Sequence, residues 1–131
     1  MICEPAMRDH QALLTAAGQL VDGGGPRHVH MACWLGRQAF EVLLSDFADE
    51  VAPGLQCSTR SRLAVVIVGF EGTELPQRAV SAWANLSRAS HLAAYELTPT
   101  QAEVRGWLDD VHLLAEMHVR LGLSDNQLPG G

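Results

Sequence analysis

Lysine, paired cysteines and long apolar runs are all missing from this chain of 131 residues, and only one tyrosine is present. Cys3, Cys33 and Cys57 are odd in number and far apart, so the sequence indicates neither a disulfide framework nor a cysteine zinc site. We expect buried or inert free thiols. No apolar stretch approaches the roughly 20 residues that a bilayer-spanning helix needs. The first residues lack the features of a signal peptide, which predicts a cytoplasmic protein with no membrane partner.

The basic residues are nine arginines against 15 acidic residues, which gives a net charge of −6. Arginine without lysine, beside many alanines and glycines, is typical of GC-rich bacterial coding. A chain with this charge does not attract nucleic acid through its overall field. Any polyanionic partner must therefore meet a local arginine cluster.

Apolar residues recur at intervals of three and four along most of the chain, a spacing typical of amphipathic helices. The length suits one domain, residues 1–131, in which 122–131 form a polar, flexible tail. The sequence predicts an all-α fold, an antiparallel bundle of four or five helices joined by short loops. The expected helices span residues 5–21, 27–51, 58–68, 73–97 and 101–121.

Local signals set the expected helix boundaries. Pro26 suits the first turn of the second helix, and Ser58 and Thr73 are the expected N-caps of the third and fourth helices. Thr98 and Gln101 have the form of a capping box at the start of the fifth helix. The inner side of the fourth helix is expected to carry Val80, Trp83, Ala84, Ser87, His91, Ala94 and Tyr95.

The run Leu63–Val68 departs from the helical pattern. Its residues are mostly β-branched, and propensity alone favours a strand. A single strand has no pairing partner in a chain without a second strand candidate. We therefore predict a buried helix here, with a strand as the alternative.

Arg88, His91 and Tyr95 are the main candidates for chemistry. They fall at i, i+3 and i+7 of the fourth predicted helix, which places them on one side of it. In a phosphate-handling site, arginine binds the oxyanion, histidine transfers a proton near neutral pH and tyrosine orients the ligand. The alternative is two core residues with satisfied polar tips, flanked by an arginine whose head reaches water.

Arg105 and His112 are the second candidate pair. They lie seven residues apart, two turns of helix, and therefore on one face. The alternative is a solvated arginine that pairs with Asp109 or Asp110 on the surface.

His28, His30 and Cys33 raise the question of a metal site. His30 and Cys33 share a helix face at a spacing of three, but His28 does not join them, and no fourth ligand is suitably spaced. We therefore expect no metal and no other cofactor.

Three segments of the chain resemble the HEPN family of small helical bundles found in prokaryotic toxins, defence proteins and nucleotidyltransferase partners. Residues 30–44, which contain Gln-Ala-Phe-Glu-Val-Leu-Leu at 38–44, resemble the long family helix. Residues 86–95 resemble the arginine-to-histidine region ahead of the last helix. The final helix, 101–121, matches the ending expected of the family.

The resemblance implies a homodimer with a composite cleft in which arginine and histidine from each subunit meet. In catalytic members this cleft cuts RNA without a metal: histidine acts as general acid or base, and arginine stabilises the phosphorane-like charge. The family places four to six residues between the arginine and the histidine. Two residues separate Arg88 from His91, which departs from this spacing, and six separate Arg105 from His112, which meets it. We therefore expect RNA or a nucleotide as the ligand and leave open whether the protein cleaves it.

Two further hypotheses remain. The chain is alternatively a non-enzymatic module that dimerises or docks another protein, with Cys33, Phe40, Leu43 and Phe47 along a dimer seam. A third hypothesis is a small-molecule pocket between the last two helices, lined by Trp83, His91, Tyr95 and Trp107.

Overall fold

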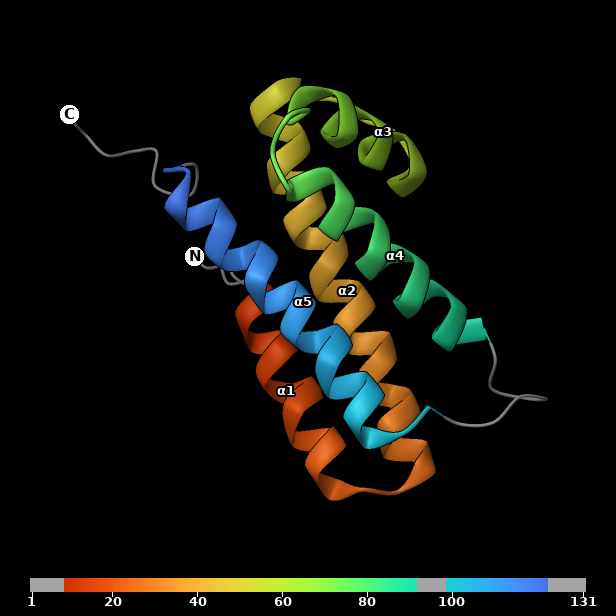
Figure 1. Cartoon of the computed structure of the whole chain (residues 1–131). Coiled ribbons are helices and arrows are strands. Elements are labelled where there is room, and N and C mark those ends of the chain that lie inside the picture. The colour runs from red at the N-terminus through yellow and green to blue at the C-terminus, as the bar shows by residue number, and fades with distance from the viewer. Residues whose placement is uncertain (1–8, 92–98, 123–131) are drawn as a thin grey trace, which may run out of the picture.

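The all-α prediction is confirmed by the computed structural model, which describes residues 9–91 and 99–122 (Figure 1). Within these two ranges the chain forms five helices and no strand. Residues 5–8 and 92–97, which the sequence predicts to be helical, and most of the predicted tail lie outside the described residues. The helices are α1 (Asp9–Gly23), α2 (Pro26–Val51), α3 (Thr59–Gly69), α4 (Leu75–His91) and α5 (Gln101–Arg120).

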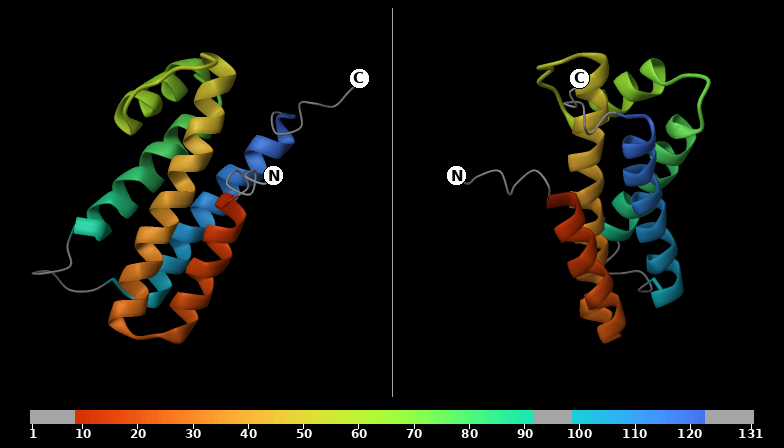
Figure 2. Two further views of the ribbon diagram at one scale, coloured as in Figure 1. Left: turned by 180° about the vertical axis from the view of Figure 1, so that it is seen from behind. Right: turned by 90° about the vertical axis from the view of Figure 1, so that its left-hand side faces the viewer.

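Four long helices make the body of the bundle. Figure 1 shows α1 and α4 running in one direction and α2 and α5 in the other, and the two views of Figure 2 show the same order. The helix α2 contacts all four of the others, whereas α3 crosses one end of the bundle and contacts α2 and α4. The pairs α1/α2, α2/α4, α4/α5 and α1/α5 are therefore antiparallel neighbours.

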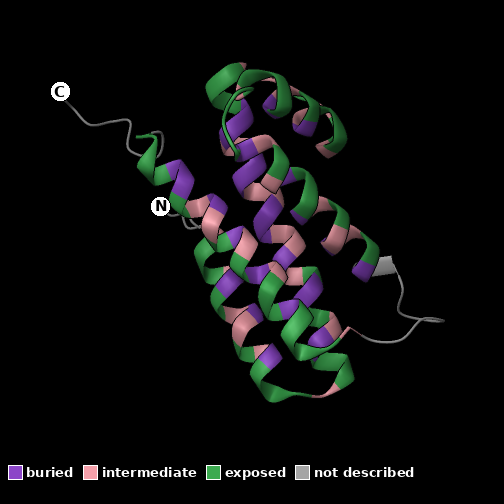
Figure 3. Cartoon of the chain, in the orientation of Figure 1, coloured by how far each residue is buried: buried purple, intermediate pink, exposed green. Residues whose placement is uncertain are grey.

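The core is organised around α2, as its apolar spacing predicts. Phe40 and Phe47 are almost completely buried, and purple segments follow the inner sides of the long helices in Figure 3. Full burial of one large apolar side chain contributes about 1.5–3 kcal/mol, so the buried residues of α2 contribute much of the stability of the bundle. The buried residues of α2 are Val29, Ala32, Cys33, Gly36, Ala39, Phe40, Leu43, Leu44, Phe47 and Ala48.

Gly36 allows the helices to approach each other closely at the middle of the bundle. A Cβ atom added at this position would lie 2.7 Å from Leu108 Cδ2 of α5 and 3.4 Å from Leu86 Cδ2 of α4. The missing side chain therefore makes room for two leucines from two different helices.

Most of the expected helix starts are confirmed. Pro26 is the first residue of α2, where its missing N–H leaves no hydrogen bond unmade. The Ser58 hydroxyl accepts a hydrogen bond from the Ser61 N–H at 3.1 Å and caps α3. The Thr73 hydroxyl accepts one from the Leu75 N–H at 3.2 Å, just ahead of α4.

The capping box of α5 lies two residues later than predicted. Thr100 Oγ1 accepts from the Glu103 N–H at 3.0 Å, and Glu103 Oε1 accepts from the Thr100 N–H at 2.9 Å. A carboxylate in the first turn also complements the helix dipole, which an amide does not. The Gln101 amide instead donates to the Val21 carbonyl of α1 at 2.6 Å.

The segment Leu63–Val68 is helical, as predicted, but the prediction that it is buried is wrong. Only Leu63 and Val66 of α3 are buried, while Val68 is 72% exposed and Ile67 is 38% exposed. The reason is position: α3 lies across the end of the bundle, so only one narrow side of it meets other helices.

The inner side of α4 differs from the predicted one by a rotation of the helix. Val80 is 42% exposed, Ala84 is exposed, and Trp83 and Ser87 are only partly buried. Small side chains let α4 approach α2 and α5 closely, so the bulky Trp83 is placed at the flank. The buried residues of α4 are Ala79, Ala82, Leu86 and Ala89, and Leu75 begins the same row.

None of the helices in the described ranges has the length and the apolar character required to cross a lipid bilayer.

Candidate functional site

Arg88 is an accessible cation near the end of α4. Its side chain is exposed, and none of the ion pairs among the described residues involves it. The side chains of His91 and Tyr95 lie outside the described residues, so the grouping of the three stays a prediction.

Aromatic and basic side chains line the edge shared by α2 and α4. The rings of Phe40 and Trp83 stack with their centroids 5.9 Å apart, and the Arg37 guanidinium lies 5.0 Å from the centre of the Trp83 ring. Arg37 Nε also lies 3.4 Å from Glu41 Oε2. A cation over an indole contributes about 0.5–1 kcal/mol at an exposed site, so this contact helps to hold the Arg37 and Trp83 side chains in one arrangement.

Trp34 and Arg88 lie at the same level of this edge. Because α2 and α4 are antiparallel and Gly36 meets Leu86, two residues before Gly36 correspond to two residues after Leu86. Trp34 is 54% exposed, which is unusual for so large an apolar ring. We use the name α2/α4 edge for the exposed surface of these two helices that carries Trp34, Arg37, Trp83 and Arg88. Arg37 and Trp83 are in contact, whereas Trp34 and Arg88, each two residues from the Gly36–Leu86 contact, point to other sides of their helices.

Arg105 and His112 do not form one site. Arg105 pairs with Asp22 of α1 through its Nη2 atom, which replaces the expected surface pairing with its neighbours on α5. His112 is exposed two turns further along α5 and lines a groove between α1 and α5. The helix face is shared, as predicted, but the two side chains have different surroundings.

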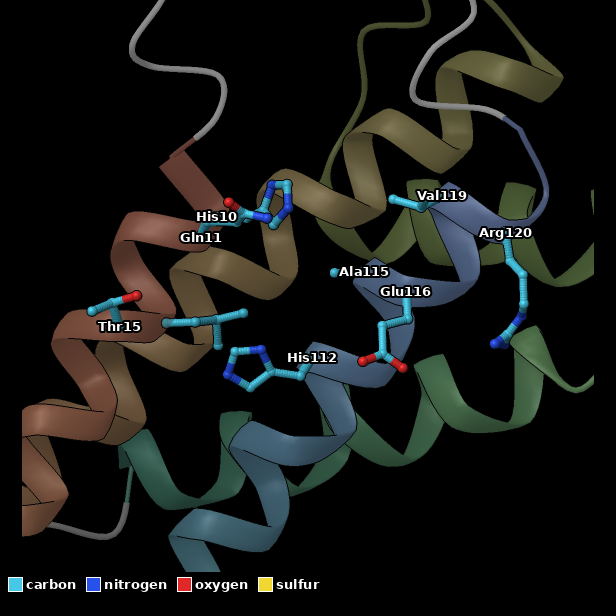
Figure 4. Close-up of a pocket in the computed structure, with 9 residues that line it drawn as sticks. His10, Gln11, Thr15, His112, Ala115, Glu116, Val119 and Arg120 are labelled. Atoms are coloured by element: carbon cyan, nitrogen blue, oxygen red, sulfur yellow. The ribbon is translucent and has the colours of Figure 1, made fainter.

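The α1/α5 groove is the larger of the two cavities described, with a volume of about 510 Å³. Leu14, Ala115 and Val119 supply its apolar lining. Figure 4 shows the His10 ring extending from α1 and the His112 ring extending from α5 into the space between the two helices. Its polar lining consists of His10, Gln11, Thr15, His112, Glu116 and Arg120.

His118 of α5 is the buried polar side chain of the described core. It is 6% exposed, its ring packs edge-on against Phe47 with the centroids 4.7 Å apart, and its Nε2 atom has no hydrogen-bond partner. Burial lowers the pKa of this imidazole, which nearby Glu50 partly offsets and His10 reinforces. The ring is therefore neutral at physiological pH.

No group of three or more histidine, cysteine or acidic side chains within residues 9–91 and 99–122 is arranged to hold a metal ion. Cys33 is buried, and burial raises its pKa to about 11, so its thiol is protonated and inert. Cys57 is also a free thiol.

The predicted aromatic pocket between the last two helices stays a prediction, because the side chains of His91 and Tyr95 lie outside the described residues. Trp83 packs on Phe40, and Trp107 packs against the core. The cavity described between α4 and α5, of about 220 Å³, is polar instead: it is lined by Glu74, Gln77, Arg78, Ser81 and Asp110.

The predicted dimer seam is also corrected. Cys33, Phe40, Leu43 and Phe47 are at most 2% exposed within a single chain, because α2 is covered by its own neighbours. The exposed large apolar side chains of α2 are Met31 and Trp34, on the opposite side of the helix, and Val51 at its end.

Comparison with known proteins finds no matching family model, and no curated protein or solved structure has significant similarity to this chain.

Proposed function

We propose that this protein is a HEPN-like helical protein that binds RNA or a nucleotide through the α2/α4 edge and the end of α4. The observation that supports this proposal is the exposed Arg88, a guanidinium without an ion-pair partner among the described residues, at the same level as the exposed ring of Trp34. A guanidinium binds phosphate oxygens in a bidentate manner, and an indole face stacks on a base.

The roles follow from the chemistry of each side chain. Arg88 binds a backbone phosphate, Trp34 stacks on an unpaired base, and His91 and Tyr95 extend the site beyond the described side chains. In a cleaving version of the site, His91 takes the proton from the 2′-hydroxyl or gives one to the leaving oxygen, while Arg88 stabilises the negative charge on the non-bridging oxygens of the phosphorane-like transition state. In that cleaving version the protein is a metal-independent ribonuclease.

RNA binding is tested by fluorescence anisotropy with a labelled single-stranded oligonucleotide. We expect Arg88→Ala to weaken binding about tenfold, because one charge-assisted hydrogen bond to phosphate is lost. The salt dependence of log Kd should also become shallower by about 0.7, the value for one phosphate contact on a single strand. Arg60→Ala is the matched control, since Arg60 is exposed on α3 and is in none of the described ion pairs.

Equal losses for the two arginine variants would mean that binding follows overall charge, and the proposed edge would then be rejected. Cleavage is measured separately, with excess EDTA, on the wild type and on Arg88→Ala and His91→Ala. If all three proteins cleave only at background level while the wild type still binds, the protein binds RNA without cutting it.

A second candidate function is self-association through exposed apolar side chains of α2 and α4, in the manner of a non-enzymatic interaction module. Three apolar side chains favour it: Met31 is 47% exposed, Trp34 is 54% exposed and Val80 is 42% exposed. A homodimer formed there would bring two copies of Arg88 toward one cleft.

Sedimentation velocity over a range of micromolar concentrations tests this dimer. We expect the wild type to sediment as a dimer and Trp34→Glu as a monomer, since a buried unpaired carboxylate is costly. Val68→Glu is the matched control, because Val68 is an exposed valine on α3, away from this edge. A wild type that stays monomeric throughout rejects the dimer but leaves RNA binding by the single chain open.

A further inference from the structure

The α1/α5 groove is a second site, on different helices from the α2/α4 edge. Its walls come from the first and the last helix, and its volume of about 510 Å³ falls within the roughly 300–1,000 Å³ of small-molecule sites. Leu14, Ala115 and Val119 give it an apolar surface. A ligand that fits it therefore has an apolar face of its own.

The polar groups of the groove are mostly ones that both donate and accept hydrogen bonds. His10 and Thr15 lie on α1, together with Gln11, and His112 lies on α5. An imidazole, an amide and a hydroxyl each offer donor and acceptor atoms. The edge of a planar nitrogen heterocycle has the same mixture, and its faces are apolar.

A row of three side chains on α5 extends the site along the helix. His112, Glu116 and Arg120 are spaced by four residues, so they lie on one side of α5 and about 6 Å apart per step. Figure 4 shows the three side chains in this order along the helix. No ion pair joins Glu116 to Arg120 among the described residues, so both charges are available to a ligand.

We propose that the α1/α5 groove binds a nucleoside monophosphate, with the base between His10 and His112, the ribose at Glu116 and the phosphate at Arg120. A carboxylate accepts hydrogen bonds from ribose hydroxyls, and a guanidinium pairs with a phosphate monoester. The three parts of the ligand follow the order of the row on α5. This site goes beyond the RNA-binding edge and does not depend on it.

The test is a calorimetric titration of the full chain with AMP, adenosine and ribose 5-phosphate. We expect one AMP per chain, adenosine about tenfold weaker because it lacks the contact at Arg120, and ribose 5-phosphate weaker still. His112→Ala should weaken AMP and adenosine about equally. Arg120→Ala should weaken AMP to the level of adenosine and leave adenosine unchanged, which a mere loss of folding would not do.

Two controls separate this site from its alternatives. His28→Ala removes an exposed histidine at the start of α2, outside the groove, and should leave AMP binding unchanged. Arg60→Ala removes an exposed arginine of α3, outside the groove, and should also leave AMP binding unchanged. The proposal is overturned if no saturable binding of AMP is found, if ribose 5-phosphate binds as tightly as AMP, or if Arg88→Ala abolishes binding while His112→Ala does not.

Discussion

The helices α2 and α3 are both rich in apolar residues, yet they contribute very differently to the core. Ten residues of α2 are buried, because other helices surround it. In α3 the uninterrupted apolar run Leu63–Val68 buries only Leu63 and Val66. The contrast shows that the number of neighbouring helices decides burial, and that the apolar content of a segment does not.

The largest expected loss of stability comes from removing the Phe47 side chain of α2. Phe47 is 2% exposed, and its ring contacts Phe70 at 5.5 Å and His118 at 4.7 Å between centroids. Phe47→Ala should lower the free energy of unfolding by about 3–5 kcal/mol, because it leaves a cavity. Val68→Ala on α3 should change it by less than about 0.5 kcal/mol, since that side chain is 72% exposed. Urea unfolding measures both, and equal losses would contradict the comparison.

A smaller effect on stability is expected at Asp46 of α2, a half-buried carboxylate that is unfavourable to ionise. Burial, and then the charges of Asp49 and Glu50, raise the pKa of Asp46 to about 6 from 3.8. A raised pKa in the folded state gives stability that is complete below about pH 3.8 and is lost as the pH rises through 6. Asp46→Asn should therefore stabilise the protein by about 1–2 kcal/mol at pH 8, after allowance for solvent screening, and hardly at all at pH 3.

The measurement is urea unfolding of wild type and variant at each pH. The variant must be compared with the wild type at the same pH, because His118 changes the stability of both with the opposite pH dependence. Its lowered pKa costs stability as the pH falls below 6.5. Glu71→Gln is the control, since Glu71 is exposed. A gain from Asp46→Asn that is the same at pH 3 and pH 8 would show that ionisation is not its cause.

Periodicity and local capping predicted the helices well, because both are properties of neighbouring residues. Ser58 and Pro26 act where the sequence places them. The capping box failed by two residues because both Thr98 and Thr100 fit the motif, and a tertiary contact of Gln101 with α1 decides between them. The rotation of α4 was missed for a related reason: alanines that pack closely outweigh a tryptophan in deciding which side faces inward.

The candidate sites were less accessible to sequence reasoning. The α1/α5 groove joins His10 and His112, which are brought together only by tertiary packing. The signal present was weak: both are histidines on or beside an apolar stripe of an amphipathic helix. The helical spacing of Arg88, His91 and Tyr95 predicts Arg88 as a candidate, and the structure shows that it is exposed. Its level relative to Trp34 follows only from the register of α2 against α4.

The contacts between α1 and α5 also bear on how the chain folds during translation. Gln101 and Arg105 of α5 hold the end of α1 at the Val21 carbonyl and at Asp22. During translation α1 and α2 leave the ribosome long before α5 exists, so their shared apolar seam stays open to water. Completion of the last helix closes that seam, and a prematurely terminated chain would present it to chaperones and proteases.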